Sequence, residues 1–222
     1  MAAALARTLE RIATAAEAAG RDARSVRLLV ATKTQPPERI LAVLREGTQL
    51  IGENRVQEIT DKAPALGSVP HTLHLIGNLQ RNKVNQVLPH VDCIQTIDTP
   101  ALAARIDDRL GVTDPGRELD VMVQVNVSGE ESKSGVAPEQ AAALVKRIGA
   151  LPRLHLVGLM TIGLNSPDVA AVRAGYARLR ALRDELVPGG ELSMGMSGDL
   201  EAAVAEGATI VRVGSAVFGR RA

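Results

Sequence analysis

Aromatic residues are almost absent from this sequence of 222 residues: Tyr176 and Phe218 are the only two, and there is no tryptophan. Proteins that bind single-stranded nucleic acid stack its bases on aromatic side chains, so this class of function is nearly excluded. An electrostatic contact with nucleic acid or with a membrane surface is not indicated either. The formal net charge is only +1, and acidic and basic residues are interspersed along the chain.

Cysteine and long apolar runs are also scarce. Cys93 is the only cysteine, which rules out an internal disulfide, and we expect a reducing, cytoplasmic location. Its apolar, strand-like surroundings favour a packed thiol over a nucleophile. The alanine-rich residues 1–20 are interrupted by Arg7, Glu10 and Arg11, which predicts a surface helix and not a signal peptide. No run is long enough to cross a bilayer, so we expect no membrane contact.

Metal-ligand clusters and the common nucleotide motifs are missing as well. His71 and His74 would point to opposite faces of a predicted strand, because side chains alternate along it. His90 and His155 have no acidic or cysteine neighbours at ligand-like spacing. We therefore expect no metal site. The absence of GxGxxG and P-loop patterns removes the simplest nucleotide-binding hypotheses.

What the sequence does contain is a regular alternation of short apolar runs and helical patterns. The predicted strands cover residues 27–33, 49–53, 73–77, 91–97, 119–127, 154–160, 191–195 and 209–214. Each strand is followed by room for a helix, and no linker rich in proline, glycine or serine interrupts the chain. This pattern predicts an α/β fold: one (β/α)8 TIM barrel over residues 1–222, with an extra N-terminal helix. A doubly wound open sheet is the alternative.

Polar and small residues gather where the predicted strands end. In a (β/α)8 barrel the strand C-termini and the loops after them build the active site, so these residues predict one shared site. The residues concerned are Lys33, Thr34, Glu53, Asn54, Arg55, Gly77, Asn78, Gln80, Asn126, Ser128, Met160, Thr161, Ser197, Gly198, Asp199, Gly214 and Ser215.

Lys33 is the first candidate among them. Strand alternation places it on the face of Leu29 and Ala31, which would be the barrel interior. In a dry pocket an amine loses part of its preference for the charged form and becomes a better nucleophile towards an aldehyde. The alternative is a lysine at a strand end whose amine simply reaches solvent.

Two loops near the C-terminus resemble a phosphate site. Ser197 and Gly198 precede a predicted helix, and Gly214 and Ser215 follow the last predicted strand, where barrels frequently bind phosphate. Taken alone, Ser197 would more simply cap its helix. Opposite Lys33, however, a phosphate pocket indicates a phosphorylated carbonyl compound held as a Schiff base. Pyridoxal 5′-phosphate (PLP) is the leading candidate, and a Schiff-base aldolase acting on sugar phosphates is the alternative.

Arg212 interrupts the apolar run TIVRVG and shares a face with Ile210 and Gly214. If that face is interior, the charge lies beneath the ligand and must be paired. A fixed cation near a pyridine nitrogen would oppose its protonation and weaken the cofactor as an electron sink. The alternative is a side chain that extends to the surface.

These residues lie in motifs that resemble those of the YggS/PROSC family of PLP homeostasis proteins. In the family's order, the chain contains VATKTQPPERI, IGENRVQE, HLIGNLQRNK, VNVSGEESKSG, GLMTIG and LSMGMSGDLEAAVAEGATIVRVGSAVFG. The resemblance covers nearly the whole chain. It implies a (β/α)8 barrel like the N-terminal domain of alanine racemase, without the racemase's second, β-rich domain. It also implies a protein that binds and buffers PLP in vitamin B6 homeostasis.

The resemblance assigns roles residue by residue. Lys33 resembles the lysine that forms the Schiff base, Asn54 lies beside the cofactor, and Arg212 faces the pyridine nitrogen. The phosphate-binding positions match Ser197, Gly214 and Ser215, with Met196 and Gly198 close by. The sequence departs from the family's usual pattern at His74-Leu75 and in GNLQRNK, which affects local packing.

We expect a carrier and not an enzyme. Racemisation needs acid/base groups on both faces of the cofactor adduct, and related racemases supply a tyrosine from their second domain. Here the only tyrosine, Tyr176, completes the apolar stripe of a predicted helix over residues 168–186. A minimal PLP-dependent racemase is the alternative. The family implies a monomer, and transient transfer of PLP to apoenzymes would follow from a carrier role.

Overall fold

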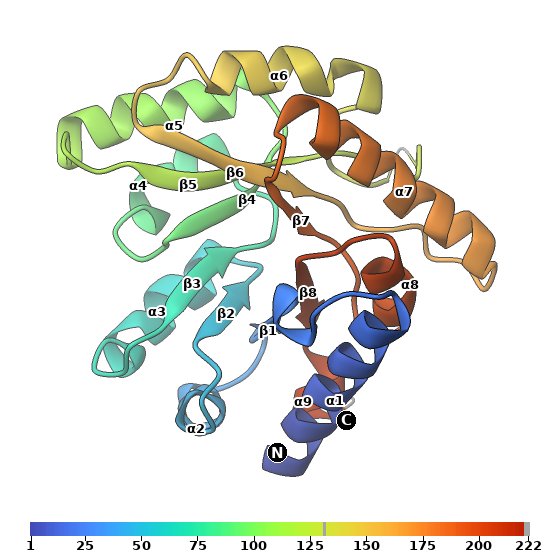
Figure 1. Ribbon diagram of the computed structural model, residues 1–222. Helices are drawn as coiled ribbons and strands as arrows, with labels where there is room; N and C mark the ends of the chain where they lie inside the picture. The colour runs from blue at the N-terminus through green and yellow to red at the C-terminus, as the bar shows by residue number, and fades with distance from the viewer. Residues whose placement is uncertain (131, 220–222) are drawn as a thin grey trace.

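Eight parallel strands form a closed barrel in chain order (Figure 1) in the computed structural model, which describes residues 1–130 and 132–219. The strands are β1 (Arg27–Ala31), β2 (Leu50–Glu53), β3 (Thr72–Leu75), β4 (Cys93–Ile97), β5 (Leu119–Gln124), β6 (Leu154–Met160), β7 (Glu191–Ser193) and β8 (Ile210–Val213). The predicted (β/α)8 barrel is confirmed. The open sheet is wrong, because β8 pairs with β1 and leaves no free edge.

Helices cover the outside of the barrel. They are α1 (Ala2–Ala18), α2 (Pro37–Arg45), α3 (Val56–Leu66), α4 (Val84–Val87), α5 (Pro100–Thr113), α6 (Ala141–Ile148), α7 (Val169–Leu186), α8 (Leu200–Ala205) and α9 (Ser215–Phe218). The extra helix α1 packs beside α8 and α9 (Figure 1). Its Arg11 donates to both carboxylate oxygens of Glu201, at 2.9 and 3.0 Å, and to the Ser197 carbonyl at 3.3 Å. The extra helix is therefore tied to the loop between β7 and α8.

Strand alternation separates two apolar layers. Outward-facing residues such as Val30 and Leu75 belong to the large core between sheet and helices, whereas Leu29, Met122 and Cys93 fill the barrel interior. Cys93 is buried and free, and burial raises the pKa of its thiol. It is therefore a packed core residue, as expected from its apolar surroundings.

The end of β1 differs from the prediction. The strand stops at Ala31, so Lys33 lies in the following loop, where its side chain is exposed. The expectation of a lysine closing a buried strand is wrong. Thr34 has a φ of +63°, in the left-handed region, which turns the chain away from the sheet before α2 begins at Pro37.

A chain of hydrogen bonds crosses the barrel interior from β8 to β3. Arg212 Nη1 donates to Ser193 Oγ at 2.8 Å, and Ser193 Oγ donates to Gln95 Oε1 at 2.6 Å. Gln95 Nε2 lies 2.7 Å from His74 Nδ1. Because an amide nitrogen is a donor, the histidine nitrogen accepts and the ring is neutral. Burial, followed by the charge of Arg27, lowers the pKa of His74 to about 4.

The neutral His74 predicts a specific loss of stability in acid. Its ring ionises near pH 6.5 in the unfolded chain and near 4 in the folded one. The unfolded state therefore binds more protons between these values, and the free energy of unfolding falls as the pH falls through this window. We expect this residue to account for about 2 to 3 kcal/mol between about pH 7 and pH 4.5.

The measurement is urea unfolding of the wild type and of His74→Gln at both pH values. The variant should lose less stability on acidification than the wild type, and the exposed control His90→Gln should behave like the wild type. An equal pH dependence in wild type and His74→Gln would contradict the assignment.

Candidate functional site

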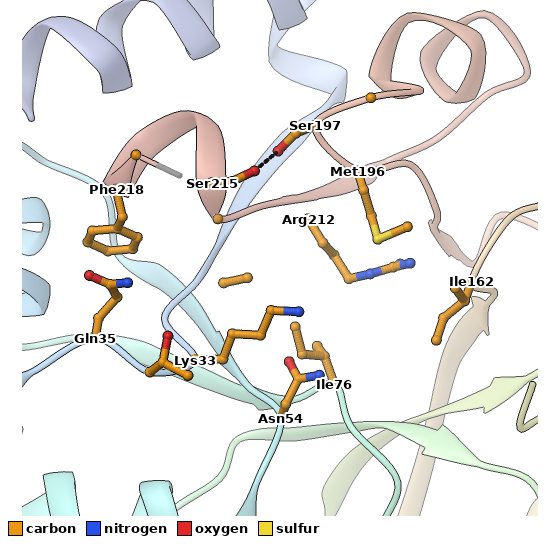
Figure 2. A pocket seen from close by; sticks show the side chains of 15 residues that line it. Lys33, Gln35, Asn54, Ile76, Ile162, Met196, Ser197, Arg212, Ser215 and Phe218 are labelled. Carbon is orange, nitrogen blue, oxygen red and sulfur yellow. Dashed lines mark hydrogen bonds between the residues drawn. The ribbon is translucent and has the colours of Figure 1, made fainter. Parts of the chain in front are cut away.

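A cavity of about 870 Å³ opens among the loops after β1, β2, β7 and β8 (Figure 2). Its lining includes all eight residues to which the family resemblance assigned a place in the site, although they lie far apart along the chain. These residues are Lys33, Asn54, Met196, Ser197, Gly198, Arg212, Gly214 and Ser215. The structure brings the whole set together, while their roles in binding stay predictions. Most of the other residues named at the strand ends do not line the cavity.

Other residues line the cavity without having been predicted. They are Ala31, Gln35, Ile76, Ile162, Phe218 and Gly219, whereas Thr34, which also lines the cavity, was expected at the end of its strand. Phe218 is held by Arg39 of α2, whose guanidinium carbon lies 5.4 Å from the ring centroid and whose Nη2 donates to the Phe218 carbonyl at 2.6 Å. Apolar side chains carry little sequence signal for a site, because most of them serve the core.

Lys33 presents an accessible amine to this cavity. Figure 2 shows its side chain extending from the β1 loop into the space between Asn54 and Arg212. Ala31, two residues earlier, lines the same cavity, in agreement with the face predicted from alternation. The Lys33 side chain thus enters the cavity from the predicted face of the sheet, but the residue is exposed and not buried.

Lys62 is the contrasting lysine. It is buried, and its amine donates to Glu53 Oε1 at 2.6 Å, to Glu58 Oε2 at 2.8 Å and to the Thr32 carbonyl at 3.1 Å. An ammonium group has three N–H donors, so all of them are used. Lys33 is the lysine that lines the cavity among the described residues.

Two serine hydroxyls meet on the opposite side of the cavity. Ser215 Oγ donates to Ser197 Oγ at 3.3 Å, which joins the loop after β8 to the loop after β7 (Figure 2). Ser197 does not cap α8, which begins at Leu200 with Asp199 at its N-cap position. The capping interpretation is therefore wrong. A Cβ on Gly214 would lie 3.0 Å from the Ala31 carbonyl oxygen, so this glycine lets the ends of β8 and β1 approach closely.

Asp199 holds the loop beside these serines. Its Oδ1 accepts from the Met196 amide at 2.6 Å, and its Oδ2 accepts from the Tyr176 hydroxyl at 2.6 Å. Burial and the Asp199 carboxylate raise the pKa of Tyr176, which keeps the phenol protonated. Tyr176 is buried in α7 as predicted, but its hydroxyl also supports this loop. Gly163 makes room for it, since a Cβ there would lie 2.3 Å from the hydroxyl oxygen.

Asn54 is fixed where the loops after β2 and β3 touch. A Cβ on Gly77 would lie only 2.1 Å from the Asn54 carbonyl oxygen, so this position needs glycine. The Gly77 carbonyl in turn accepts from Thr96 Oγ1 at 2.8 Å. The close approach of the two loops sets where the Asn54 side chain enters the cavity wall.

Arg212 supplies a buried positive charge. It is 5% exposed, which decides between the two interpretations in favour of the barrel interior. Its guanidinium donates to Ser193 Oγ and, at 2.6 Å, to the Thr161 carbonyl. Burial lowers the pKa of Arg212 to about 10, so it stays cationic at neutral pH. Its hydrogen-bond acceptors are neutral, and the Asp199 carboxylate acts on it only through space. The buried cation therefore favours an anionic ligand in the cavity.

The described residues hold neither a metal-ligand cluster nor a membrane-spanning helix. No group of three or more histidine, cysteine, aspartate or glutamate side chains placed to hold a metal ion occurs in residues 1–130 and 132–219. Across the same residues, every helix is too short or too polar to span a membrane.

Residues 3–222 match the family model described as alanine racemase, N-terminal domain, which agrees with the barrel. Over 218 residues the chain is 43% identical to the pyridoxal phosphate homeostasis protein of Pseudomonas aeruginosa, covering 98% of this chain and 94% of that protein. The chain belongs to the family of pyridoxal phosphate homeostasis proteins, as its motifs predicted.

Solved structures support the same relationship. A crystal structure of a Bifidobacterium adolescentis protein is 45% identical, with a TM-score of 0.91, and the match covers 98% of this chain and 94% of that one. PipY of Synechococcus elongatus, solved with PLP bound, is 36% identical, with a TM-score of 0.80 and coverage of 88% and 93%.

The bond between Tyr176 and Asp199 predicts a measurable coupling. A short hydrogen bond to a carboxylate is worth about 1.5 to 3 kcal/mol, so Tyr176→Phe and Asp199→Asn should show non-additive losses in the free energy of unfolding. A double-mutant cycle measured by urea unfolding gives this coupling. The control is a cycle of Tyr176→Phe with Glu201→Gln. Because the Glu201 carboxylate binds Arg11 and not Tyr176, the two losses in the free energy of unfolding should be additive. A Tyr176–Asp199 coupling below about 0.5 kcal/mol would contradict the assignment.

Proposed function

We propose that this chain binds PLP, with residues 1–222 acting as one unit, and serves PLP homeostasis. The observation that carries the proposal is the cavity itself. It places one accessible lysine amine opposite two paired serine hydroxyls, with a buried cation in its wall. An aldehyde and a phosphate on one small molecule would satisfy the amine and the hydroxyls together. The names and the bound ligand of the related proteins agree with this ligand.

Different residues of the cavity bind different groups of the ligand. The Lys33 amine condenses with the aldehyde, forming a C=N bond and releasing water, so that the ligand is held as a Schiff base. The Ser197 hydroxyl donates a hydrogen bond to the phosphate, and Ser215 exchanges its hydrogen bond to Ser197 for one to the phosphate. Gly198 and Gly214 line the cavity beside them. The remaining members of the site are Asn54, beside the cofactor, Met196, close to the phosphate-binding positions, and Arg212, facing the ring nitrogen.

We propose a carrier role without robust catalysis. Bound PLP supplies an electron-withdrawing ring conjugated to an imine, and the ring withdraws electrons most strongly in its protonated form. Arg212 is cationic, so it opposes protonation of a neighbouring ring nitrogen. The phenol of Tyr176 is bonded to Asp199, and its raised pKa makes it a poor proton donor or acceptor. Among the described residues that line the cavity, Lys33 is then the single acid/base group.

Three further features belong to the same proposal. The protein acts as a monomer in the cytoplasm, where a reduced Cys93 is stable, and it passes PLP transiently to apoenzymes. An open cavity suits this exchange, because Lys33 and Ser215 are exposed and the ligand can leave without unfolding of the barrel.

The central test is the visible absorbance of purified protein incubated with PLP. Wild type and the control Lys146→Ala, on the exposed side of α6, should develop the band of a Schiff base, and Lys33→Ala should not. Borohydride reduction followed by peptide mass analysis should locate the adduct on Lys33. An equal band in wild type and Lys33→Ala would refute the assignment.

The carrier role is tested by exchange at the α-carbon. L-Alanine is incubated in D₂O with PLP-loaded protein, and deuterium incorporation is followed by NMR. Because the described part of the cavity wall holds no second acid/base group, we expect a rate no higher than that of free PLP. Faster exchange that disappears in Lys33→Ala would establish a racemase-like enzyme instead.

A further inference from the structure

A buried cluster of charges lies behind the loop that carries Lys33. Lys62 and Glu58 are one turn apart on α3, and Glu53 ends β2. The Lys62 amine contacts both carboxylates, and the Thr32 hydroxyl donates to Glu53 Oε1 at 2.7 Å. These groups do not line the cavity of about 870 Å³ and take no part in the binding proposed above.

The cluster reaches the two peptide groups that flank Lys33. The carbonyl of Thr32, just before Lys33, accepts from Lys62 Nζ at 3.1 Å. The amide of Thr34, just after it, donates to Glu58 Oε2 at 2.6 Å. Any rotation about the backbone bonds of Lys33 would move one of these peptide groups. Holding both therefore fixes the backbone of Lys33.

The backbone of Thr34 needs these hydrogen bonds, because its conformation is an unfavourable one. Thr34 is the one residue other than glycine with a positive φ in the described chain, and β-branched residues avoid this region. Such a conformation persists only where the surroundings impose it. A charge-assisted hydrogen bond from the Thr34 amide to Glu58 supplies that constraint.

The charges within the cluster explain why Lys62 is central. Burial raises the pKa of Glu53. For Glu58, burial also acts upwards, but the hydrogen bonds from Lys62 and the Thr34 amide outweigh it and lower the pKa. Glu58 is thus an anion that needs Lys62. Without the ammonium, the two carboxylates would repel each other, and α3 would lose its hydrogen bonds to Thr32 and Thr34 of the Lys33 loop.

We infer that Lys62 and Glu58 are positioning residues, which fix the backbone of Lys33 from behind and so direct its amine into the cavity. The inference rests on the proposed role of Lys33 in binding PLP. It adds that formation of the C=N bond depends on side chains of α3 that never touch the ligand.

The test separates covalent capture from binding. Stopped-flow absorbance measures the rate at which PLP forms its band with Lys33. Titration with pyridoxine 5′-phosphate, which has the phosphate but no aldehyde, measures the rest of the site. Because Lys62→Met alone would bury two uncompensated carboxylates, the main variant is Lys62→Met/Glu53→Gln. Glu58→Gln is the milder one.

We expect capture to slow by about 10- to 100-fold in the double variant, the usual cost of a misplaced reacting group, and by a smaller factor in Glu58→Gln. The dissociation constant for pyridoxine 5′-phosphate should stay within about twofold of the wild type, since the serine loops are unchanged. Leu144→Ala, in the buried face of α6, controls for loss of stability alone and should capture PLP at the wild-type rate.

Two results would overturn the inference: wild-type capture rates in the α3 variants, or a parallel loss of capture and of pyridoxine 5′-phosphate binding. Failure of the underlying proposal is distinct, because the wild type itself would then form no band.

Discussion

The pairing of β1 with β8 is the constraint on which the site depends. In this pair Arg27 lies opposite Ile210 and Val30 opposite Val213, so the two strands end together. Their ends carry the Lys33 loop and the Gly214–Ser215 turn. The close approach of Gly214 to the Ala31 carbonyl shows how tightly the ends are joined. A shift of this register would separate the amine from the hydroxyl pair, although neither loop need change its own conformation.

Two buried cations near this junction have hydrogen-bond partners of opposite kinds, neutral for one and charged for the other. Arg212 is bound by a hydroxyl and a carbonyl, so its positive potential extends into the cavity. Lys62 is bound by two carboxylates and a carbonyl, so its positive charge is neutralised inside the cluster. The first arrangement favours an anionic ligand, and the second leaves Lys33 as the amine available to it. Charge distribution thus distinguishes two lysines that are only 29 positions apart in the sequence.

Much of the fold and the site could be predicted from the sequence, for identifiable reasons. Apolar alternation locates strands, and parallel closure gathers their C-terminal ends, which was enough to place Lys33, Asn54 and Ser197 around one cavity. The hydrogen bond of Tyr176 and the contacts of Lys62 were not predicted. Both link a helix to a loop of another strand, and periodicity shows which face is buried without naming the atoms that meet across it.

The error at the end of β1 has a similar origin. The run RLLVATK is uniformly suited to a strand up to Lys33, and nothing in its pattern marks Ala31 as the end. The turn is imposed at Thr34 by Glu58, a residue of α3 on the other side of β2. Local propensity was overridden by a tertiary contact, as is common for short strands.

Closure by the first and last strands also has a consequence for synthesis of the protein. The ribosome makes β1 early and β8 last, and contacts between segments so distant along the chain form late in folding. Lys33 therefore emerges long before the serines that complete its cavity. A nascent chain offers an aldehyde a bare lysine with no anchor for a phosphate. If Lys33 and the serines hold the ligand as proposed, the protein acquires its selectivity for a phosphorylated ligand only when β8 has paired with β1.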